Sequence, residues 1–279
     1  DLVKFGVAKK VTDGLDEAGV AYDLFDDVKA NPTIANVQNG LAAFKKSNAD
    51  VIIAIGGGSA IDTAKIMWLM YEHPEEDFLD LATVFIDIRK RVYEFPKMGI
   101  KAKLVGIPTT AGTGSEVTPF TIISDANTGA KWPLADYELL PTMAIVDADN
   151  MMNMPKGVTR ASGYDVLTHA VEAYVSIMAS DYTDGFALTA IKNVFKYLPR
   201  AYKNGAKDQD GGRLVSRGHR LCQRLPGREP LPGPQAGRLA PHPSRHGQRA
   251  AVHGDLQVQR PADAHQDGHV LPVSVSPRL

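Results

Sequence analysis

Cysteine and long apolar runs are what this sequence has least of. Its one cysteine, Cys222, excludes a disulfide framework and favours a reducing, cytoplasmic location. No stretch approaches the ~20 consecutive apolar residues of a membrane span, and no secretory signal opens the chain. With 44% hydrophobic and 23% charged residues among 279, the composition is typical of a soluble globular enzyme.

The chain as a whole also lacks an excess of one charge sign, since its formal net charge is -1. Its basic and acidic residues are, however, unevenly distributed along the sequence. Residues 1–212 contain 21 Lys and Arg against 28 Asp and Glu, whereas residues 213–279 contain 10 against 4. The acidic excess of the longer part argues against a nucleic-acid or membrane surface, so neither partner is expected.

Residues 213–279 lack Lys, Ile, Met, Phe, Tyr, Trp, Asn and Thr altogether, yet contain nine prolines. Such a segment cannot bury enough apolar surface to offset the entropy of ordering it, which predicts a disordered tail. Its wealth of Arg, Pro, Gly, Ala, His and Gln is also typical of a GC-rich gene translated out of register.

A frameshift after about residue 212 is therefore our leading hypothesis. Back-translated with permitted codons and read one nucleotide out of register, residues 218–236 give GIAFANAFLGVNHSLAHKL. Residues 241–247 similarly give HIPHG, and residues 263–277 give PTKMATFSQYQYP. One short match is expected from codon freedom, but three in order are not. The nucleotide sequence for Lys207 to Arg217 tests the hypothesis.

Helical and strand patterns alternate over residues 1–150, as in a doubly wound α/β domain with a mostly parallel, Rossmann-like sheet. Apolar runs predict strands at 21–25, 50–55, 103–108 and 143–147. Amphipathic spacing predicts helices at 3–20, 31–46 (capped by Asn31, Pro32 and Thr33) and 59–71.

After Pro155 the pattern is helical throughout, at 161–180 and 182–203. We expect a dinucleotide-binding domain over residues 1–150, the start of an all-helical metal-binding domain over 151–210 and a non-native tail over 211–279. The chain has no initiator methionine and opens like the middle of a domain; the family resemblance described below implies that its first strand is missing.

A loop of three glycines, Gly56 to Gly58, separates the predicted strand at 50–55 from the helix at 59–71. Glycines let the backbone approach a pyrophosphate, and the N–H groups of a helix N-terminus favour an anion. The loop is not the G-x-G-x-x-G fingerprint, and Ser59 and Asp62 have capping-box spacing, so an ordinary helix start is the alternative.

Two further polar features accompany this loop. Asp26 closes the predicted strand at 21–25, where a carboxylate would bind a ribose 2′-hydroxyl and repel the extra phosphate of NADP; the alternative is a solvated loop acid. The hydroxyls and glycines of residues 107–116, IPTTAGTGSE, suit a loop over a phosphate or nicotinamide ring, or an ordinary polar loop.

Asp165 and His169 are one turn apart in the helix predicted at 161–180, so both project from one face. A carboxylate oxygen and an imidazole nitrogen suit Fe²⁺ or Zn²⁺, although such a pair is also a common surface hydrogen bond. A catalytic metal needs at least three protein ligands. Of the other histidines, His73 adjoins Pro74 in the first domain, and six lie in the tail.

Together these motifs resemble the iron-containing (group III) alcohol dehydrogenases, and most of all the alcohol dehydrogenase half of bifunctional aldehyde–alcohol dehydrogenases. The likeness covers about residues 1–209 and is carried by GGGSAIDTAK at 56–65, IPTTAGTGSEVT at 107–118 and GYDVLTHAVEAYVS at 163–176. Residues 70–103 look like the insertion of the bifunctional enzymes.

The resemblance implies a dinucleotide domain, a helical domain and a metal in the cleft between them. By match, the NAD-contacting residues are Gly57, Gly58, Ser59, Asp62, Thr109, Thr110, Thr113 and Lys131. Asp26 falls at the position that disfavours NADP, and Asp165 and His169 match the first two metal ligands. The other two ligands are histidines in contexts like NHSLAH and HIPHG, so His242 and His246 are not assigned. Arg160 departs from the pattern, which has a small apolar residue there.

The implied reaction is reversible hydride transfer between an ethanol-like primary alcohol and NAD, with Fe²⁺, or Zn²⁺, as a Lewis acid. The intact family implies a homo-oligomer. Because two of four metal ligands are missing, the chain as written is expected to be inactive. The alternatives are a non-catalytic NAD-binding or scaffold module, and a glycerol dehydrogenase or dehydroquinate synthase relative, against which the insertion argues.

Overall fold

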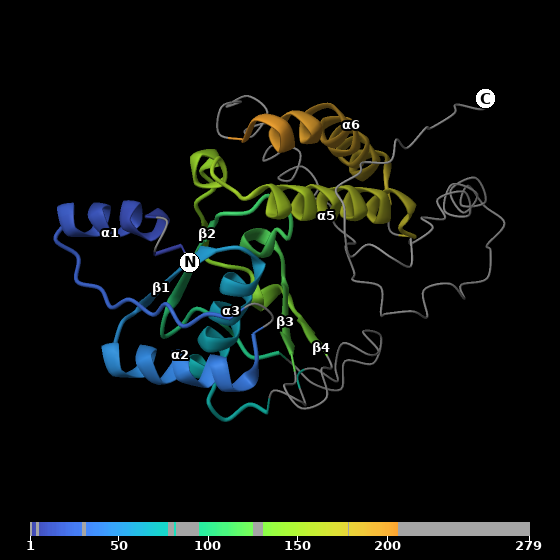
Figure 1. Cartoon of the computed structure of the whole chain (residues 1–279). Helices are drawn as coiled ribbons and strands as arrows, with labels where there is room; N and C mark the ends of the chain where they lie inside the picture. Colours follow the sequence, from blue (N-terminus) through green and yellow to red (C-terminus); the bar gives the residue numbers. More distant parts are fainter. Residues whose placement is uncertain are drawn as a thin grey trace, which may run out of the picture. The chain divides into compact units, whose positions relative to one another are not determined.

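The computed structural model describes residues 2–3, 6–29, 32–77, 81, 95–124, 131–177 and 179–205 (Figure 1). All of them belong to one compact unit. The predicted tail at 211–279, the strings behind the frameshift hypothesis and residues 78–80 and 82–94 of the 70–103 insertion lie outside the described residues.

A parallel sheet organises the first part of the chain, in the order β1-β2-β5. Strand β1 (Val51–Gly56) and β2 (Lys103–Pro108) pair in register from Val51 opposite Lys103 to Gly56 opposite Pro108. Both strands lie where the apolar runs predicted them. Because the strands are parallel and in register, the glycine loop after β1 and the threonine-rich loop after β2 begin at the same edge of the sheet.

The third strand, β5, is shorter than predicted: Met143–Ala144 rather than 143–147. Ile145 N still donates to Gly106 O at 2.9 Å. The Asp147 side chain then accepts from Asp149 N at 2.9 Å and begins the 3₁₀ helix η4 (Ala148–Met151), which ends the extended backbone.

Three helices accompany the sheet: α1 (Val7–Glu17), α2 (Ile34–Ser47) and α3 (Gly58–Glu72). All three were predicted, with α1 shorter than the expected 3–20. Thr33 is the N-cap of α2, as predicted, and its hydroxyl accepts a hydrogen bond from Asn36 N.

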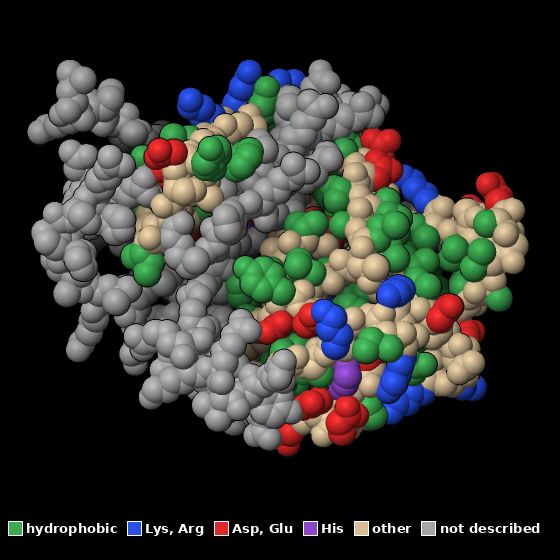
Figure 2. Space-filling view, turned by 180° about the vertical axis from the view of Figure 1, so that it is seen from behind, with side chains coloured by type: hydrophobic (Ala, Val, Ile, Leu, Met, Phe, Trp, Pro, Cys, Tyr) green, Lys and Arg blue, Asp and Glu red, His purple; other side chains and the backbone are tan. Residues whose placement is uncertain are grey.

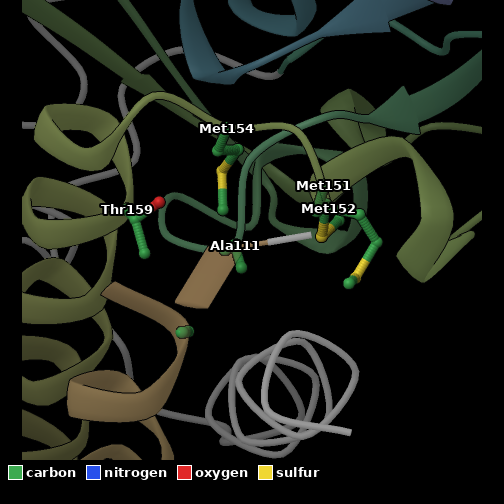
Figure 3. Close-up of a pocket in the computed structure, with 7 residues that line it drawn as sticks. Ala111, Met151, Met152, Met154 and Thr159 are labelled. Atoms are coloured by element: carbon green, nitrogen blue, oxygen red, sulfur yellow. The ribbon is translucent and has the colours of Figure 1, made fainter. Parts of the chain in front are cut away.

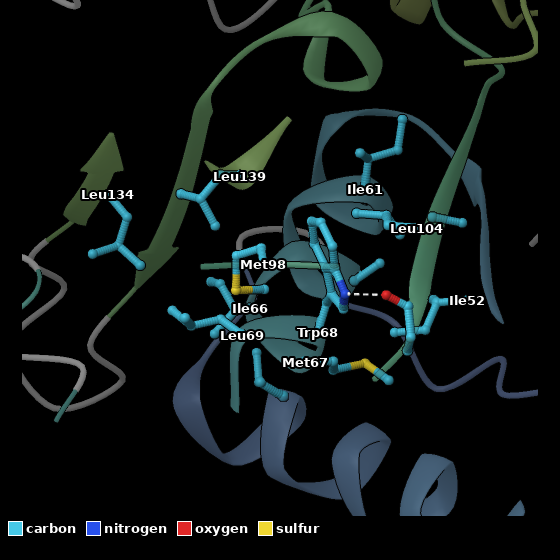
Figure 4. Close-up of a cluster of buried hydrophobic side chains, with 14 of the residues drawn as sticks. Ile52, Ile61, Ile66, Met67, Trp68, Leu69, Met98, Leu104, Leu134 and Leu139 are labelled. Carbon is cyan, nitrogen blue, oxygen red and sulfur yellow. Dashed lines mark hydrogen bonds between the residues drawn. The ribbon is translucent and has the colours of Figure 1, made fainter. Parts of the chain in front are cut away.

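Helix α3 forms the centre of the hydrophobic core (Figure 4). It is buried on nearly all sides against the sheet, α2 and the segment after β2. Trp68 Nε1 donates to Ala102 O and to Glu72 Oε1, both at 3.0 Å. Among the largest fully buried side chains of this core are Ile61, Ile66, Trp68, Leu104, Ile123, Leu134 and Leu139.

The strand predicted at 21–25 is wrong: residues 20–29 contain no helix or strand and are mostly exposed. A lone extended segment gains a ladder only where a neighbouring strand supplies partners, and none in the described part pairs with it. The segment is held by side chains instead. Asn36 donates to Asp27 O and accepts from Lys29 N.

An antiparallel pair that the sequence analysis missed follows the second loop: β3 (Phe120–Ser124) and β4 (Lys131–Ala135). It is joined to α3 through hydrogen bonds, because Thr121 Oγ1 donates to Asp62 O and Lys65 Nζ donates to Phe120 O. The hairpin therefore fixes the far end of the threonine-rich loop.

The helical part consists of α5 (Lys156–Val175) and α6 (Asp181–Asn204), which pack side by side (Figure 1). Val166, Ala170, Ala190 and Val194 are buried between them. Both helices were predicted, although α5 begins five residues earlier than 161 and ends before Ser180, the N-cap of α6. No helix among the described residues is long and apolar enough to cross a membrane.

Basic, acidic and apolar side chains are intermingled on the face of the described part that Figure 2 shows. On that face the described residues form no surface of a single charge sign.

Candidate functional site

The glycine loop and the threonine-rich loop pack directly against each other. A β-carbon built on Gly57 would lie 3.1 Å from Thr110 Oγ1, and one on Gly58 would lie 2.7 Å from Thr113 Cγ2. Thr109 N donates to Gly56 O at 2.9 Å. The two glycines therefore have a role that the sequence analysis missed, because the second loop occupies the space that their side chains would need.

Helix α3 begins at Gly58, with Gly57 as its N-cap, and no side chain caps it. The capping-box alternative for Ser59 and Asp62 is therefore wrong: Ser59 already lies inside the helix, and its carbonyl accepts from Thr63 Oγ1. No acidic residue lies in the first turn. The N-terminal N–H groups and the positive end of the helix dipole thus fit a phosphate anion.

The Asp62 carboxylate turns into the protein instead. Burial raises the pKa of Asp62 to about 6, although Lys65, the Ser115 hydroxyl and the Ile122 amide each favour the charged form. Its Oδ1 atom is buried and has no hydrogen-bond partner. Asp62 therefore belongs to the contact between α3 and the segment after the threonine-rich loop, and its predicted contact with NAD stays a prediction.

Lys65, one turn further along α3, is fully buried. Its ammonium group donates to Thr118 O at 2.6 Å and to Phe120 O at 2.7 Å. These carbonyls lie 53 and 55 residues away in the sequence, so Lys65 fastens α3 to the end of the threonine-rich loop. Lys65 ends the family motif at 56–65, to which no role was assigned at this position; a lysine directly before the apolar run at 66–70 was the available signal.

The same loop also contacts the helical part. A β-carbon on Gly112 would lie 2.9 Å from Ser162 Cβ and 3.1 Å from Asp165 Oδ2, both on α5. The segment from Thr109 to Ser115 thus lies between the N-terminus of α3 and the predicted metal ligand Asp165. Residues from two predicted sites, far apart in the sequence, meet at one loop.

Asp165 and His169, the two predicted metal ligands, lie next to each other on α5, and their metal role stays a prediction. His169 Nε2 lies 3.5 Å from Asp165 Oδ1, with 19% and 38% of the side chains exposed. A carboxylate oxygen and an imidazole nitrogen on one helix face fit Fe²⁺ or Zn²⁺ as two ligands. No group of three or more His, Cys, Asp and Glu suited to a metal exists among the described residues.

Asp26 and Lys131 belong to other segments of the fold than the threonine-rich loop, α3 and α5. Asp26 is exposed within residues 20–29, between Phe25 and Asp27. A β-carbon on Gly40 would lie 3.1 Å from Phe25 Cε1, so Phe25 packs on α2 and limits where Asp26 can lie. Lys131 begins β4 and is exposed. The cofactor roles of both stay predictions.

A small apolar pocket lies beside Ala111, next to Gly112 in the same loop (Figure 3). It is lined by Ala111, Met151, Met152, Met154, Thr159, Ala201 and Gly205. No sequence motif pointed to these methionines. Met151 is buried with Ala111 and Ala201, so the pocket is the edge of a small core cluster between the loop and the helices.

Comparison with known sequences decides the family. The model of the iron-containing alcohol dehydrogenase family matches residues 1–148, more than half of the chain. This chain belongs to that family. The model of the C-terminal part of Fe-containing alcohol dehydrogenases matches residues 159–215.

Relatives of this iron-containing alcohol dehydrogenase chain agree. Bifunctional aldehyde-alcohol dehydrogenase AdhE of Escherichia coli (strain K12) is 54% identical over 203 residues, which are 73% of this chain and 23% of that protein. The chain therefore spans less than a quarter of the length of that curated relative.

Two solved structures show the same fold. An iron-containing alcohol dehydrogenase from Thermococcus thioreducens has a TM-score of 0.72 at 32% identity, over 80% of this chain and 56% of that one. Sulfoacetaldehyde reductase from Bifidobacterium kashiwanohense, solved in complex with NAD⁺, has a TM-score of 0.67 at 28% identity, over the same shares. The predicted α/β fold class and family are thus confirmed.

Proposed function

We propose that this chain carries the NAD-binding half and two metal ligands of an alcohol dehydrogenase that interconverts an ethanol-like primary alcohol and its aldehyde. One observation carries the proposal: the loop from Thr109 to Ser115 contacts Gly57 and Gly58 on one side and the Asp165 turn of α5 on the other. Groups suited to a dinucleotide and to a metal ion therefore share one loop.

On the cofactor side, each group has a physical role. The N-terminus of α3 offers backbone N–H groups to a pyrophosphate. The hydroxyls of Thr109, Thr110 and Thr113 offer further hydrogen bonds from the facing loop. Asp26 would favour NAD over NADP, because its carboxylate accepts from a ribose 2′-hydroxyl and repels a 2′-phosphate.

On the metal side, Asp165 and His169 would supply two ligands. A bound Fe²⁺ or Zn²⁺ supplies Lewis-acid chemistry, which lowers the pKa of an alcohol oxygen. Two protein ligands do not hold a catalytic metal, which needs at least three and an open position. We therefore infer that the 279-residue chain binds NADH and does not turn over alcohol.

The test compares the chain as written with a version whose residues after 212 are encoded in the shifted frame. NADH fluorescence should report binding by both proteins. Tightly bound iron or zinc that is retained through dialysis, and NAD-linked ethanol or acetaldehyde turnover, should appear only in the repaired version, because two ligands allow only weak metal binding. Turnover above background by the original chain would refute its inactivity, and failure of both to bind NADH would refute the cofactor proposal.

A second candidate is a non-catalytic NAD-binding module. It is favoured by the absence of a third metal ligand near Asp165 and His169 in the described part of the chain. A repaired version that binds NADH but neither metal nor alcohol would support this module over the enzyme.

A further inference from the structure

The contact between Gly112 and helix α5 is tighter than the packing of an ordinary loop. The positions nearest to a β-carbon on Gly112 are Ser162 Cβ at 2.9 Å, Ser162 Cα at 3.0 Å and Asp165 Oδ2 at 3.1 Å. Two of these atoms belong to the rigid part of a residue inside a 20-residue helix. A side chain at position 112 therefore cannot be accommodated by rotating a flexible neighbour.

The helix side of the contact is also fixed. The Ser162 hydroxyl donates to Val158 O at 2.8 Å and to Thr159 O at 3.3 Å, so its side chain is turned back along its own helix. This leaves the β-carbon of Ser162 facing Gly112. The Asp165 carboxylate then divides its two oxygens, with Oδ2 toward Gly112 and Oδ1 toward His169.

The loop cannot move away from α5 easily, because its flanking residues are fastened to α3. Thr110 and Thr113 pack on Gly57 and Gly58, and Thr109 N donates to Gly56 O. Thr109 is 5% exposed and Ala111 is 1% exposed, and Gly112 is buried as well, so the middle of the loop is enclosed although Thr113 is exposed. A bulkier residue at 112 would have to displace either α5 or the glycine loop.

We propose that Gly112 is a positioning residue for Asp165. Because glycine has no side chain, the loop can approach α5 closely, and this distance determines where the Asp165 carboxylate lies relative to His169. The proposal rests on the proposed function, in that Asp165 and His169 are metal ligands. It adds that the loop facing the dinucleotide also determines the geometry of the metal ligands.

The test uses the 279-residue chain and Co²⁺ as a paramagnetic probe, followed through the imidazole resonances of His169 and His73. Co²⁺ should broaden the His169 signal first, while His73, hydrogen-bonded to Lys97 O, serves as an internal control. A His169→Gln spectrum assigns the signal. Gly112→Ala should raise the Co²⁺ concentration for half-broadening about tenfold, as for other losses of ligand support.

The matched control is Gly157→Ala, in the same helix, where a β-carbon meets nothing within 4 Å. It should leave the half-broadening concentration unchanged. In the Gly112→Ala background, Ser162→Gly removes the nearest β-carbon and should restore Co²⁺ broadening in part, which a general loss of stability would not do. If Gly112→Ala does not fold, Ser162→Thr is the second variant, because it adds a methyl group on the helix side of the contact. Like Gly112→Ala, it should raise the Co²⁺ concentration for half-broadening.

The outcomes separate the two proposals. NADH fluorescence on the same samples tests cofactor binding independently of Co²⁺. If wild type shows no selective broadening of His169, the metal role of the pair fails. If broadening is selective but equal in wild type, Gly112→Ala and Ser162→Thr, the positioning role of Gly112 is overturned while the proposed function stands.

Discussion

Thr113 lies against Gly58 so closely that a β-carbon on the glycine would come within 2.7 Å of the threonine methyl group and 3.1 Å of its β-carbon. Rotating the Thr113 side chain relieves the first contact but not the second. The two residues are 55 positions apart: Gly58 is the first residue of α3, and Thr113 belongs to the threonine-rich loop. Their contact makes the shape of one loop depend on the other.

The first prediction follows from this contact. Gly58→Ala should weaken NADH binding about tenfold or more, which is about 1.4 kcal/mol, because the threonine-rich loop must shift away from the N-terminus of α3. NADH fluorescence measures the effect. Gly14→Ala in α1, where a β-carbon meets nothing within 4 Å, is the control and should bind NADH like wild type. Unchanged affinity in Gly58→Ala would contradict the role of the loop contact.

The second prediction concerns Asp62, whose burial raises its pKa from 3.8 to about 6. A folded-state pKa above the unfolded value means that this group contributes stability below about pH 4 and loses it as the pH rises through about 6. The difference of about two units corresponds to about 3 kcal/mol between these limits.

Asp62→Asn, which does not titrate, should therefore gain stability relative to wild type as the pH rises from 4 to 7. Urea unfolding of both proteins across this range measures the difference. Asp23→Asn changes an exposed carboxylate and is the control. A constant difference between wild type and Asp62→Asn over the whole range would show that the Asp62 carboxylate does not take up its proton in this window.

The third prediction concerns the choice of cofactor. Asp26→Ala removes the carboxylate proposed to face the ribose 2′-hydroxyl, so it should weaken NADH binding and strengthen NADPH binding. The ratio of the two affinities should change about tenfold, as expected for one charged contact. Asp27→Ala keeps the backbone carbonyl that accepts from Asn36 and should leave the ratio unchanged. If Asp27→Ala and Asp26→Ala change the ratio equally, Asp26 has no specific role.

Local sequence patterns were sufficient for β1, β2 and α2. Residues 51–56 and 103–108 form strands because a continuous apolar run is stable as a strand only when both faces are covered. Helix α2 begins after Thr33 because a hydroxyl before an amphipathic run satisfies a free N–H group. The candidate site residues were also found from local sequence patterns, since only certain side chains can bind a phosphate or a metal ion.

Local patterns failed where the partner of a segment decides its structure. Residues 21–25 have the composition of a strand, but a strand forms only beside another. Residues 120–124 and 131–135 do form strands, because they pair with each other. Helix α3 supports this pair through Lys65 and the Asp62 carbonyl. Neither outcome is contained in the periodicity of the segments themselves.

By itself, the sequence determined the alternation of elements and the family motifs, and it predicted a metal-ligand pair at Asp165 and His169. Only the tertiary structure decided that Gly57 and Gly58 make room for the second loop, that the Asp62 carboxylate turns inward, and that Gly112 lies against Asp165. The physical reason is that these are contacts between residues about 50 positions apart. Side-chain chemistry and spacing predict what each residue can do, whereas packing alone determines which residues meet.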